Sequence, residues 1–594
     1  MSPNPSSVSA APADPAASAE TDADATSTDR ANTGRPERPA RKPRPKKTRS
    51  EGQWARGYRE PLNPAERFKR DDPPLNVRDR IIDLYSELGQ SSIDQSDLRG
   101  RFRWMGLYTQ RAEGYDGTWT GDDNADLLES KYFMMRVRAD GQRLNLERMR
   151  TIAGISKDFA RDTLDITNRQ NFQYHWIAIE DVPEIWRRLG EVGMQTTSAC
   201  GDCPRGMLGS PLAGLAVDEV LDASPALDEI VRRYIGDPTF ANLPRKYKTA
   251  VSGLQDLPHE INDISFVGVQ HPEHGPGLDL WVGGGLSTVP HFAQRLGAWV
   301  PLDDVPDVWE AVTKLFRDYG YRRLRSKNRL KFLVKDWGPE KVREVLETEY
   351  LHYRLIDGPA PEPVTRVRDH VGVQKLKNGL NAVGVAPVSG RISGTQLGRF
   401  ADAVEKAGGS EVRTTPYQKL IALDIADDQV DQLVADLDAI GLPANPTPWR
   451  RSIMTCTGLE YCKLAFVETR RRAIALLPEL EERMADLNAQ LDVPVTVHLN
   501  GCPNSCARIQ TADIGFKGQL IEQPDGSKAE GFQVHLGGSL GEDLGLGRKV
   551  RQHKVLSSEL GDYIERVVRN FIAQRGEGER FAQWVARAED EDLT

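Results

Sequence analysis

The chain has 594 residues, of which 39% are hydrophobic and 28% are charged, and its formal net charge at pH 7 is -9. A chain of this length can bury several hydrophobic cores, so we expect roughly three or four domains. The acidic balance, with a sequence pI of about 5.8, argues against nucleic acid as the main partner, because nucleic-acid-binding domains present a basic face.

No apolar run approaches the length of about 20 residues that spans a bilayer, and the first 30 residues lack the apolar region of a secretory signal. We therefore expect a cytoplasmic protein without a membrane-inserted segment. Disulfides are rare in the cytoplasm, so the cysteines are expected to be ligands or reactive thiols. There are six of them: Cys200, Cys203, Cys456, Cys462, Cys502 and Cys506.

Residues 1–50 are predicted to form a disordered tail. Ala, Ser, Pro, Thr and Asp dominate the first 34 residues, which include no aromatic residue, so this segment cannot bury enough apolar surface to offset its ordering entropy. The basic run at 35–49 favours a solvated linker, with an acidic or nucleic-acid partner as the alternative. Globular composition begins at Trp54, and residues 51–125 are predicted to be an N-terminal arm.

An internal repeat occupies most of the remaining chain. Residues 165–194 and 413–442 each predict a turn, an apolar strand and a helix. Their registers agree, because Thr415 minus Thr167 is 248 and Gly441 minus Gly193 is also 248. The apolar positions follow the spacing i, i+3, i+4, i+7 of a single helix face: Val182, Ile185, Trp186 and Leu189 match Val430, Leu433, Val434 and Leu437.

A second pair of similar segments extends this repeat. "NDISFVGVQ" matches "ADIGFKGQL", and Phe516 minus Phe266 is 250. The chain therefore reads as a duplication of about 250 residues. We expect the two halves to pack about a pseudo-twofold axis, with non-equivalent residues of each half contacting a central ligand.

Four cysteines fall in two short loops of the second half. "TCTGLEYC" contains Cys456 and Cys462, and after 39 intervening residues "CPNSC" contains Cys502 and Cys506. A predicted helix and the strand "VPVTVHLN" would bring the loops together. Zinc remains an alternative although the first spacing is wide for it, and unconnected buried thiols are another. An iron–sulfur cubane is favoured, because four thiolates are its usual ligands.

The two cysteine loops resemble those of a known family. "TCTGLEYCKLA" and "NGCPNSCAR" look like the signature of the sirohaem and [4Fe-4S] nitrite and sulfite reductases, and the duplication is similar to that family's two-fold architecture. The resemblance runs from about residue 80 to the C-terminus and is nearest to the ferredoxin-dependent sulfite reductases of actinobacteria. It implies that the four cysteines bind the cubane, and that the Cys506 thiolate is also the axial ligand of the sirohaem iron.

The resemblance also implies an α+β fold of three domains. We expect ferredoxin-like half-domains of the two repeats at 126–197 and 375–447. Residues 198–374 would form the sirohaem and substrate domain of the first repeat, and residues 448–594 the [4Fe-4S] and sirohaem domain of the second.

The family binds its substrate with a cluster of cations over the open face of the sirohaem. Matching motifs here supply Arg136 in "FMMRVRADG", Arg205 in "ACGDCPRGM", and Lys246 and Lys248 in "LPRKYKTAVSG". We place both lysines in a strand, where residues i and i+2 share a face. Crowded cations lower a lysine pKa, so lysine is the expected proton donor and arginine the expected anion clamp. A solvated surface charge is the alternative for each.

Other matched residues are predicted to serve the cofactor or to form a cross-link. Arg169 and Gln170 in "TNRQNFQ" would contact sirohaem carboxylates, with turn stabilisation as the alternative. In the actinobacterial relatives a cysteine at the place of Cys200 forms a thioether with a tyrosine at the place of Tyr108, and both residues are present here. We expect the same cross-link, with a free buried thiol as the alternative.

These resemblances predict an assimilatory sulfite reductase that uses reduced ferredoxin for the six-electron reduction of sulfite to sulfide, acting as a monomer. Ferredoxin-nitrite reductase is the alternative. Lysine at both Lys246 and Lys248 favours sulfite, because the nitrite enzymes tend to keep only the first, and the Tyr108 and Cys200 pair points the same way. A non-catalytic cluster-binding protein is a third reading, and the retained cations argue against it.

Overall fold

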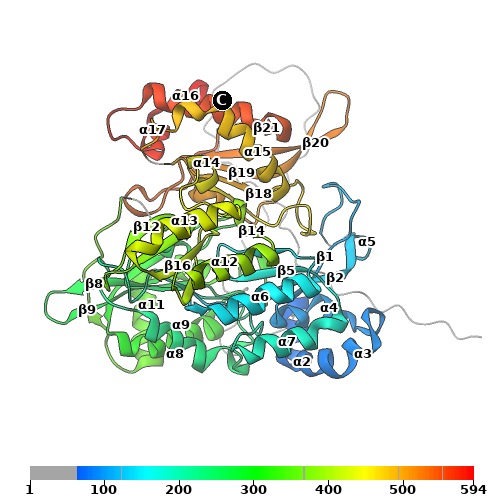
Figure 1. Cartoon of the computed structure of the whole chain (residues 1–594). Coiled ribbons are helices and arrows are strands. Elements are labelled where there is room, and N and C mark those ends of the chain that lie inside the picture. Colours follow the sequence, from blue (N-terminus) through cyan, green and yellow to red (C-terminus); the bar gives the residue numbers. More distant parts are fainter. Residues whose placement is uncertain (1–62, 122–123, 366–367, 493, 551–552) are drawn as a thin grey trace, which may run out of the picture.

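The fold is described from a computed structural model, which covers residues 63–594 except 122–123, 366–367, 493 and 551–552 (Figure 1). The predicted tail at 1–50 and the first part of the predicted arm lie outside the described residues. The C-terminal part of the chain, drawn in orange and red, stacks on one side of the remaining domains (Figure 1).

Two five-stranded sheets form the centre of the molecule. Each takes its last strand from the other half of the chain, through the pairs Arg391 with Asp165 and Glu411 with Asn145. The first has the strand order β1 (Leu107–Arg111), β2 (Glu129–Val137), β5 (Phe172–Ile177), β4 (Leu164–Ile166) and β14 (Arg391–Ile392). The second has the order β12 (Gly372–Lys375), β13 (Asn381–Val385), β16 (Leu420–Ile425), β15 (Glu411–Thr414) and β3 (Leu144–Asn145).

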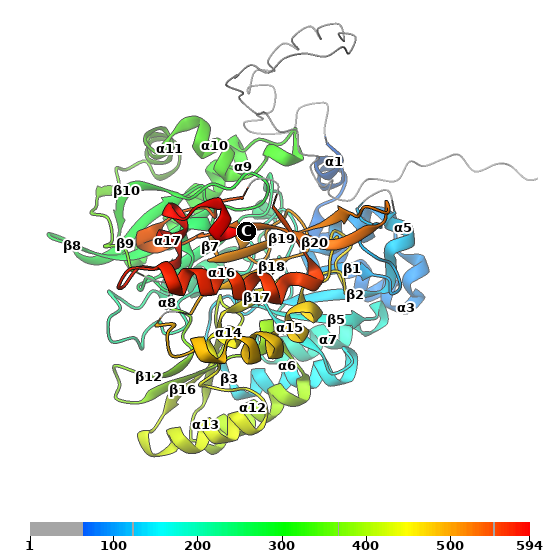
Figure 2. The same cartoon turned by 90° about the horizontal axis from the view of Figure 1, so that it is seen from above.

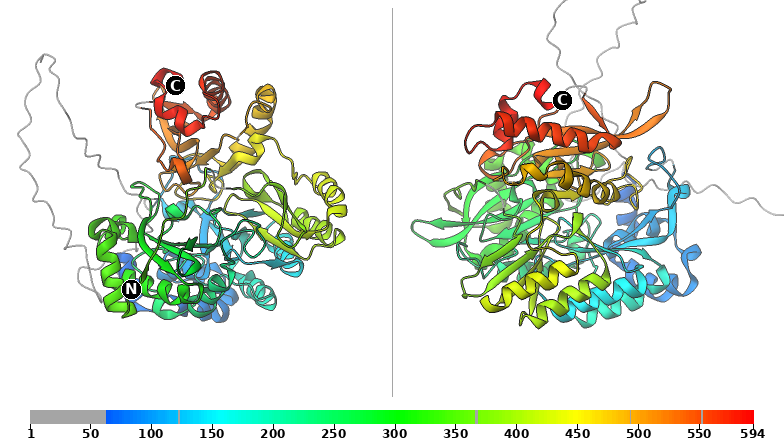
Figure 3. Two further views of the ribbon diagram at one scale, coloured as in Figure 1. Left: turned by 90° about the vertical axis from the view of Figure 1, so that its left-hand side faces the viewer. Right: turned by 45° about the horizontal axis from the view of Figure 1, so that its top comes forward.

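Four helices cover these sheets, and the two central ones lie side by side (Figure 1 and Figure 3). These are α6 (Leu146–Phe159) and α12 (Gly394–Lys406). They approach closely at Gly394, where a Cβ atom would lie 2.5 Å from the carbonyl oxygen of Ala153. The two sheets and their helices bury one common hydrophobic core, so the duplicated units form a single domain.

The predicted helix registers are confirmed. Helix α7 (Val182–Glu191) buries all four predicted apolar positions of the first repeat. Helix α13 (Val430–Ala439) buries Leu433 and Leu437, while Val430 and Val434 pack at the edge of the same core. The spacing of apolar residues therefore identified the buried face of each helix.

Each half also contributes an outer sheet with its own core. The sheet of the first half runs β11 (Ile356–Asp357), β10 (Gln294–Val300), β9 (Gly275–Val282), β8 (Ile264–His271), β7 (Thr249–Ser252) and β6 (Leu208–Gly209). The sheet of the second half runs β17 (Ile453–Thr455), β18 (Val497–Asn500), β19 (Ile514–Glu522), β20 (Lys528–Leu536) and β21 (Lys554–Leu556). The three large cores confirm the α+β fold of three domains.

The outer sheets repeat the same local pattern. In each, three parallel strands are followed by an antiparallel hairpin, and a helix covers the sheet: α9 (Val305–Tyr319) in the first half and α16 (Leu560–Gln574) in the second. Figure 2 shows α16 running across its sheet. The helix and strand predicted between the cysteine loops are confirmed as α15 (Arg470–Arg483) and β18.

The described part of the N-terminal arm completes the central domain. Its strand β1 pairs with β2, and its short helices place Val77, Ile81, Phe102 and Trp104 in the common core. The arm therefore packs as part of the first half, and the domain boundaries given above stay predictions.

Candidate functional site

The sheet of the second half brings the two cysteine loops together. Strands β17 and β18 are parallel neighbours, with Thr455 beside Leu499, so the loops that follow them leave from the same edge of the sheet. The N–H of Cys456 donates to the carbonyl of Leu499 at 3.1 Å, and the N–H of Gly501 donates to the Cys456 sulfur at 3.2 Å.

The four thiols lie close enough to affect one another electrostatically. Burial, followed by the influence of Cys506, raises the pKa of Cys456 to about 12. Burial and the neighbouring cysteines also raise the pKa of Cys462 and of Cys502. Within the described residues, no group of three or more His, Cys, Asp or Glu side chains is arranged to hold a single metal ion. Mutually repelling buried thiolates need a positive centre, and an iron–sulfur cluster supplies one.

Next to Cys506 lies a small cavity that is lined by both halves of the chain. Both predicted lysines line it, and the second half contributes Asn504, Ser505, Cys506 and Arg508. The described residues that form this lining include no carboxylate. The first half contributes Asn168, Arg169, Leu208, Lys246, Lys248, Pro258, Ile261, Asn262, Leu286, Ser287 and Arg329.

The two lysines precede a strand rather than forming part of one, which corrects the predicted placement. Strand β7 begins at Thr249, and the chain just before it makes only a single bridge, from Tyr247 to Pro204. The alternation of side chains is nevertheless kept. Lys246 and Lys248 line the cavity, whereas Tyr247 is fully buried and packs on Trp309 and Phe316.

Burial in this crowded environment changes the acidity of both lysines. Desolvation, followed by Arg329, Arg245 and Arg205, lowers the pKa of Lys246 to about 8. Desolvation, followed by Arg169 and Lys246, lowers the pKa of Lys248 well below its usual range. At neutral pH such groups can release a proton far more easily than a surface lysine.

Arg136 and Arg205 lie at a neighbouring position and are not among the lining residues of the cavity. From strand β2, Arg136 Nη1 donates to the Cys200 sulfur at 2.6 Å, and Nη2 donates to Gln173 Oε1 at 2.9 Å. Arg205 Nε donates to the carbonyl of Gly201 at 2.9 Å. Burial opposes the charge of Arg205, but Tyr108 and Cys200 keep its pKa above the usual range.

The predicted cross-link partners share this position. Burial, followed by the nearby Cys200 thiol, raises the pKa of Tyr108 to about 12. Arg103 lies over the Tyr108 ring at 5.8 Å from its centroid, and Cys203 donates to the carbonyl of Cys200 at 2.7 Å. The structure therefore brings Tyr108, Cys200, Arg136 and Arg205 into one cluster.

The two polar residues predicted to contact the cofactor differ in their surroundings. Arg169 lines the cavity and donates to Asn262 Oδ1 at 2.8 Å, and burial lowers its pKa to about 9. Arg169 also donates to the main-chain carbonyls of Gly206 and Thr249. Gln170 is not among the lining residues of the cavity, and its Nε2 donates to the carbonyls of Gly209 and Thr414, at 2.9 and 2.8 Å. Its repeat mate Gln418 bonds Thr455 in the same manner.

The sequence reasoning missed Asn262, Asp263, Arg329 and Arg508. Asp263 lies behind the lysines and accepts a hydrogen bond from the N–H of Lys248 at 2.9 Å. Arg329 precedes helix α10 (Leu330–Trp337) and pairs with Asp263. A single arginine before a helix matches no sequence motif. The internal repeat could have pointed to Arg329, because Arg580 precedes helix α17 (Phe581–Arg587) at the matching place in the second half.

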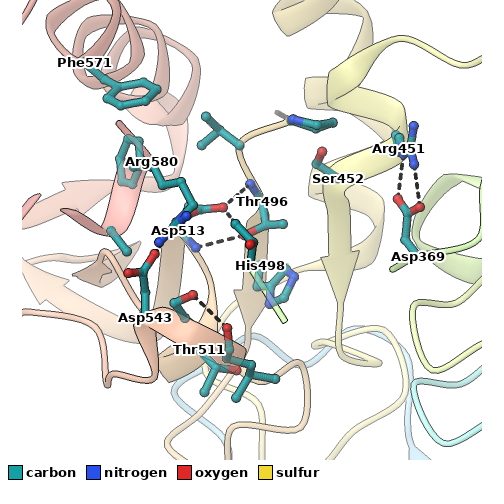
Figure 4. Close-up of a pocket in the computed structure, with 18 of the residues that line it drawn as sticks. Asp369, Arg451, Ser452, Thr496, His498, Thr511, Asp513, Asp543, Phe571 and Arg580 are labelled. Carbon is teal, nitrogen blue, oxygen red and sulfur yellow. Dashed lines mark hydrogen bonds and ion pairs between the residues drawn. The ribbon is translucent and has the colours of Figure 1, made fainter. Parts of the chain in front are cut away.

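A larger cavity lies at the corresponding place in the second half. Thr496 takes the place of Lys248 there, and Asp513 takes the place of Asp263. The N–H of Thr496 donates to Asp513 at 2.9 Å, as the N–H of Lys248 donates to Asp263. Figure 4 shows this cavity, with Asp513 beside Thr496 and with Arg451 bound to Asp369. Its lining mixes acidic and basic side chains, so the smaller cavity is the stronger candidate for an anion.

Family models match both kinds of unit in the chain. The nitrite and sulfite reductase 4Fe-4S domain matches residues 200–354 and 448–592. The nitrite/sulfite reductase ferredoxin-like half domain matches residues 127–192 and 373–440. The chain belongs to the nitrite and sulfite reductase family. This confirms the family resemblance, and the cofactors of the family are a [4Fe-4S] cluster and sirohaem.

Curated members of the family align over nearly the whole chain. A protein named sulfite reductase [ferredoxin] 1, from Mycolicibacterium paratuberculosis, is 68% identical over 550 residues, which are 93% of this chain and 99% of that protein. The sulfite reductase [ferredoxin] of Mycobacterium tuberculosis matches equally well. A ferredoxin–nitrite reductase of Synechococcus elongatus is 34% identical over 503 residues, covering 82% of this chain and 93% of that protein.

A solved structure of the family has the same fold. The structure of the Mycobacterium tuberculosis NirA protein superposes with a TM-score of 0.91 at 68% identity, and the match covers 92% of this chain and all of that one. Among the described residues, no helix is long and apolar enough to cross a membrane.

The residues present fit the family's two cofactors. Four thiols meet at one sheet edge, with Cys502 buried, Cys456 and Cys462 partly buried and Cys506 exposed, and four thiolates are the usual ligands of a cubane. The cavity beside Cys506 is lined by Arg169, Lys246, Lys248 and Arg329 without a lining carboxylate among the described residues. Such a set of donors suits sirohaem, whose many carboxylates need cations and N–H groups.

Proposed function

We propose that this protein is a ferredoxin-dependent assimilatory sulfite reductase, which reduces sulfite to sulfide with six electrons. The observation that carries the proposal is the pair of half-buried lysines, Lys246 and Lys248, on the same cavity as Cys506. The relatives named sulfite reductase [ferredoxin] are 68% identical, whereas a relative named nitrite reductase is 34% identical. Ferredoxin is the proposed electron donor, and the enzyme is proposed to act as a cytoplasmic monomer.

Cys456, Cys462, Cys502 and Cys506 are the residues proposed to hold the [4Fe-4S] cluster, and the Cys506 thiolate would also bind the sirohaem iron. When bound, these cofactors would pass on the electrons delivered by ferredoxin and would supply the iron at which the substrate reacts. The cavity position of Cys506 supports this division, because one thiolate at the boundary can serve both groups. Arg169 is the proposed partner of a sirohaem carboxylate. Gln170 is less suited to this role, because it does not line the cavity.

The cations of the first half are proposed to bind and protonate the substrate. Sulfite is a small anion whose oxygens leave as water, so each cleaved bond requires protons at oxygen. Lys246 and Lys248 would donate those protons, because burial lowers their pKa values. The guanidinium groups of Arg136 and Arg205 would hold the anion and polarise its S–O bonds.

Steady-state assays with sulfite and nitrite, using the same reduced ferredoxin, test this proposal. A larger kcat/KM for sulfite is expected. A larger value for nitrite would instead assign the chain to the nitrite reductases. No turnover of either substrate by protein that shows a sirohaem absorption spectrum would favour a non-catalytic cluster-binding protein.

A further inference from the structure

A buried arginine of the N-terminal arm holds the loop that contains two of the proposed cluster ligands. We call residues 456–466 the cluster loop. Arg111 is the last residue of strand β1, and its main-chain N–H donates to the carbonyl of Tyr461 at 2.9 Å. The pairing of β1 with β2 is irregular between Thr109 and Arg111, and such irregularities redirect a side chain.

The guanidinium of Arg111 donates five hydrogen bonds, all to main-chain carbonyl oxygens. Three go to the cluster loop: Cys462 at 3.2 Å, Lys463 at 3.3 Å and Ala465 at 3.0 Å. The other two go to Asp116 at 3.2 Å and Trp119 at 2.9 Å. Nη2 makes three of these contacts, and Nε and Nη1 make one each. The bond from Nε directly contacts the peptide group of a proposed ligand, Cys462.

The segment that follows Arg111 closes over the same loop. A Cβ atom on Gly117 would lie 1.6 Å from the carbonyl oxygen of Phe466, so no larger residue fits there without movement. The N–H of Gly121 donates to the carbonyl of Lys463 at 3.3 Å. Arg111 is therefore enclosed between its own segment and the cluster loop, and only 2% of its surface is exposed.

The positive charge of Arg111 is retained at this buried place. Burial lowers its pKa, and Cys462, Asp116 and Glu468 act in the opposite direction. An arginine nevertheless stays protonated in proteins. The side chain of Asp116 bonds Thr118 rather than Arg111. In surroundings of low dielectric constant, a charge beside a thiolate ligand acts strongly on the cluster.

We propose that Arg111 is a positioning residue for the cluster loop and that its buried charge raises the reduction potential of the [4Fe-4S] cluster. Reduction adds one negative charge to the cluster, and a nearby cation stabilises the reduced form more than the oxidised form. Cluster potentials depend on net charge and hydrogen bonding around the sulfurs. The inference rests on the proposed ligation by the four cysteines, but not on the identity of the substrate.

Two substitutions separate the charge from the geometry. Arg111→Gln removes the charge, whereas Arg111→Lys keeps it and loses the five-donor fork. The midpoint potential of the cluster in each purified holoenzyme is measured by a redox titration followed by electron paramagnetic resonance. For Arg111→Gln we expect the ratio of reduced to oxidised cluster at a fixed potential to fall by about tenfold, a shift of about 59 mV for one electron. Arg111→Lys should stay near the wild-type potential.

The chain offers a matched control in Arg413, on strand β15. Its side chain is buried and donates to the carbonyls of Ser210 and Ala213, at 2.5 and 3.1 Å. Ser210 follows Gly209 as Cys456 follows Thr455, and Gln170 and Gln418 bond Gly209 and Thr455 alike. Arg413→Gln therefore removes a buried arginine that bonds the equivalent loop of the first half, and the cluster potential should not change.

The outcomes distinguish this inference from the failure of the proposed function. An unchanged potential in Arg111→Gln, or an equal shift in Arg413→Gln, would overturn it. If Arg111→Gln holds no cluster by iron analysis, Arg111→Lys decides: a tenfold change in the ratio despite the retained charge would contradict the electrostatic role. Wild-type protein with less than four irons per chain would count against the cluster ligation itself, and a preference for nitrite would affect only the substrate assignment.

Discussion

Asp263 and Arg329 form a buried bidentate ion pair directly behind the lysines of the cavity. Arg329 Nε donates to Asp263 Oδ1 at 3.0 Å, and Nη2 donates to Oδ2 at 2.8 Å. The carboxylate also accepts the main-chain N–H of Lys248, and its side chain is fully buried. Asp263 thus links the segment of the lysines to the start of helix α10.

We expect Asp263→Asn to weaken both folding and substrate binding. The substitution leaves the charge of Arg329 buried without its partner, which typically costs about 3–5 kcal/mol of stability. It also removes the negative charge that stabilises the protonated form of Lys248. Thermal unfolding should shift to lower temperature, and KM for sulfite should rise by about tenfold, or 1.4 kcal/mol of binding.

Asp513→Asn is the matched control, because Asp513 holds the equivalent place in the second half and accepts from the N–H and hydroxyl of Thr496 at 2.9 and 2.7 Å. This variant should lose stability while keeping the wild-type KM. A rise in KM of the same size in both variants would show that Asp263 acts only through general stability.

The acidity of Lys246 predicts an alkaline limit of substrate binding. Its pKa is lowered to about 8, so the side chain is charged below that pH and becomes neutral as the pH rises through it. A neutral amine attracts the anion less strongly, and KM for sulfite should therefore rise above about pH 8. The groups that act on Lys246 are Arg329, Arg245, Arg205 and Cys506.

Lys246→Arg separates this effect from the titration of sulfite itself. Arginine stays charged throughout the accessible range, so the rise in KM at alkaline pH should disappear, while kcat falls because arginine is a poor proton donor. The comparison is a pair of KM and kcat profiles from pH 6 to 9.5 on the same substrate solutions. Identical alkaline limbs in the two proteins would rule out Lys246 as the titrating group.

Lys248→Asn tests the discrimination between substrates. Sulfite has three oxygens to hold and to protonate, whereas nitrite has two, so the second lysine should matter more for sulfite. Removing one preorganised donor typically costs about 10²–10³ in rate, and we expect a loss of about 10² in kcat/KM for sulfite with a smaller loss for nitrite. Equal losses for the two substrates would refute a discriminating role.

Much of the architecture could be predicted from the sequence because the same pattern of turn, strand and helix occurs in both halves of the chain. The equal offsets of Thr167 and Gly193 from their mates fixed the register of strand, turn and helix, and the structure confirms both helix faces. The two cysteine pairs could be brought together because an intervening helix and strand return the chain to the same sheet edge. In the structure, β17 and β18 pair in parallel, and the two loops that contain the cysteines follow them at the same sheet edge.

Other features depend on contacts that local sequence does not encode. Asp263 and Arg329 are 66 residues apart, and neither lies in a recognisable motif. Arg111 bonds main-chain carbonyl oxygens. Every residue has such an oxygen, so the side chains in the sequence do not identify the residues that Arg111 bonds. Gln170 sits inside a motif, yet its amide bonds main-chain groups. A motif identifies a place in the fold more securely than it identifies the role of each residue there.

The cluster around Cys200 leads to the last prediction, a thioether between Tyr108 and Cys200. Arg136 bonds the Cys200 sulfur, and Tyr108 is close enough for the thiol to raise its pKa. Formation of the C–S bond removes one hydrogen from the ring and one from the thiol, with both electrons passing to an external oxidant. The linked peptides should therefore travel together in a proteolytic digest, two hydrogen atoms lighter than their summed mass.

Two variants make that measurement specific. Tyr108→Phe removes the hydroxyl that activates the ring and should abolish the linked species, and Cys200→Ala removes the sulfur. Cys203→Ala is the control, because Cys203 is equally buried and bonds the main-chain carbonyls of Cys200 and Ser198, so the cross-link should persist in it. Separate peptides in the wild-type holoenzyme would leave Cys200 a free thiol, and persistence of the link in Tyr108→Phe would place it on another residue.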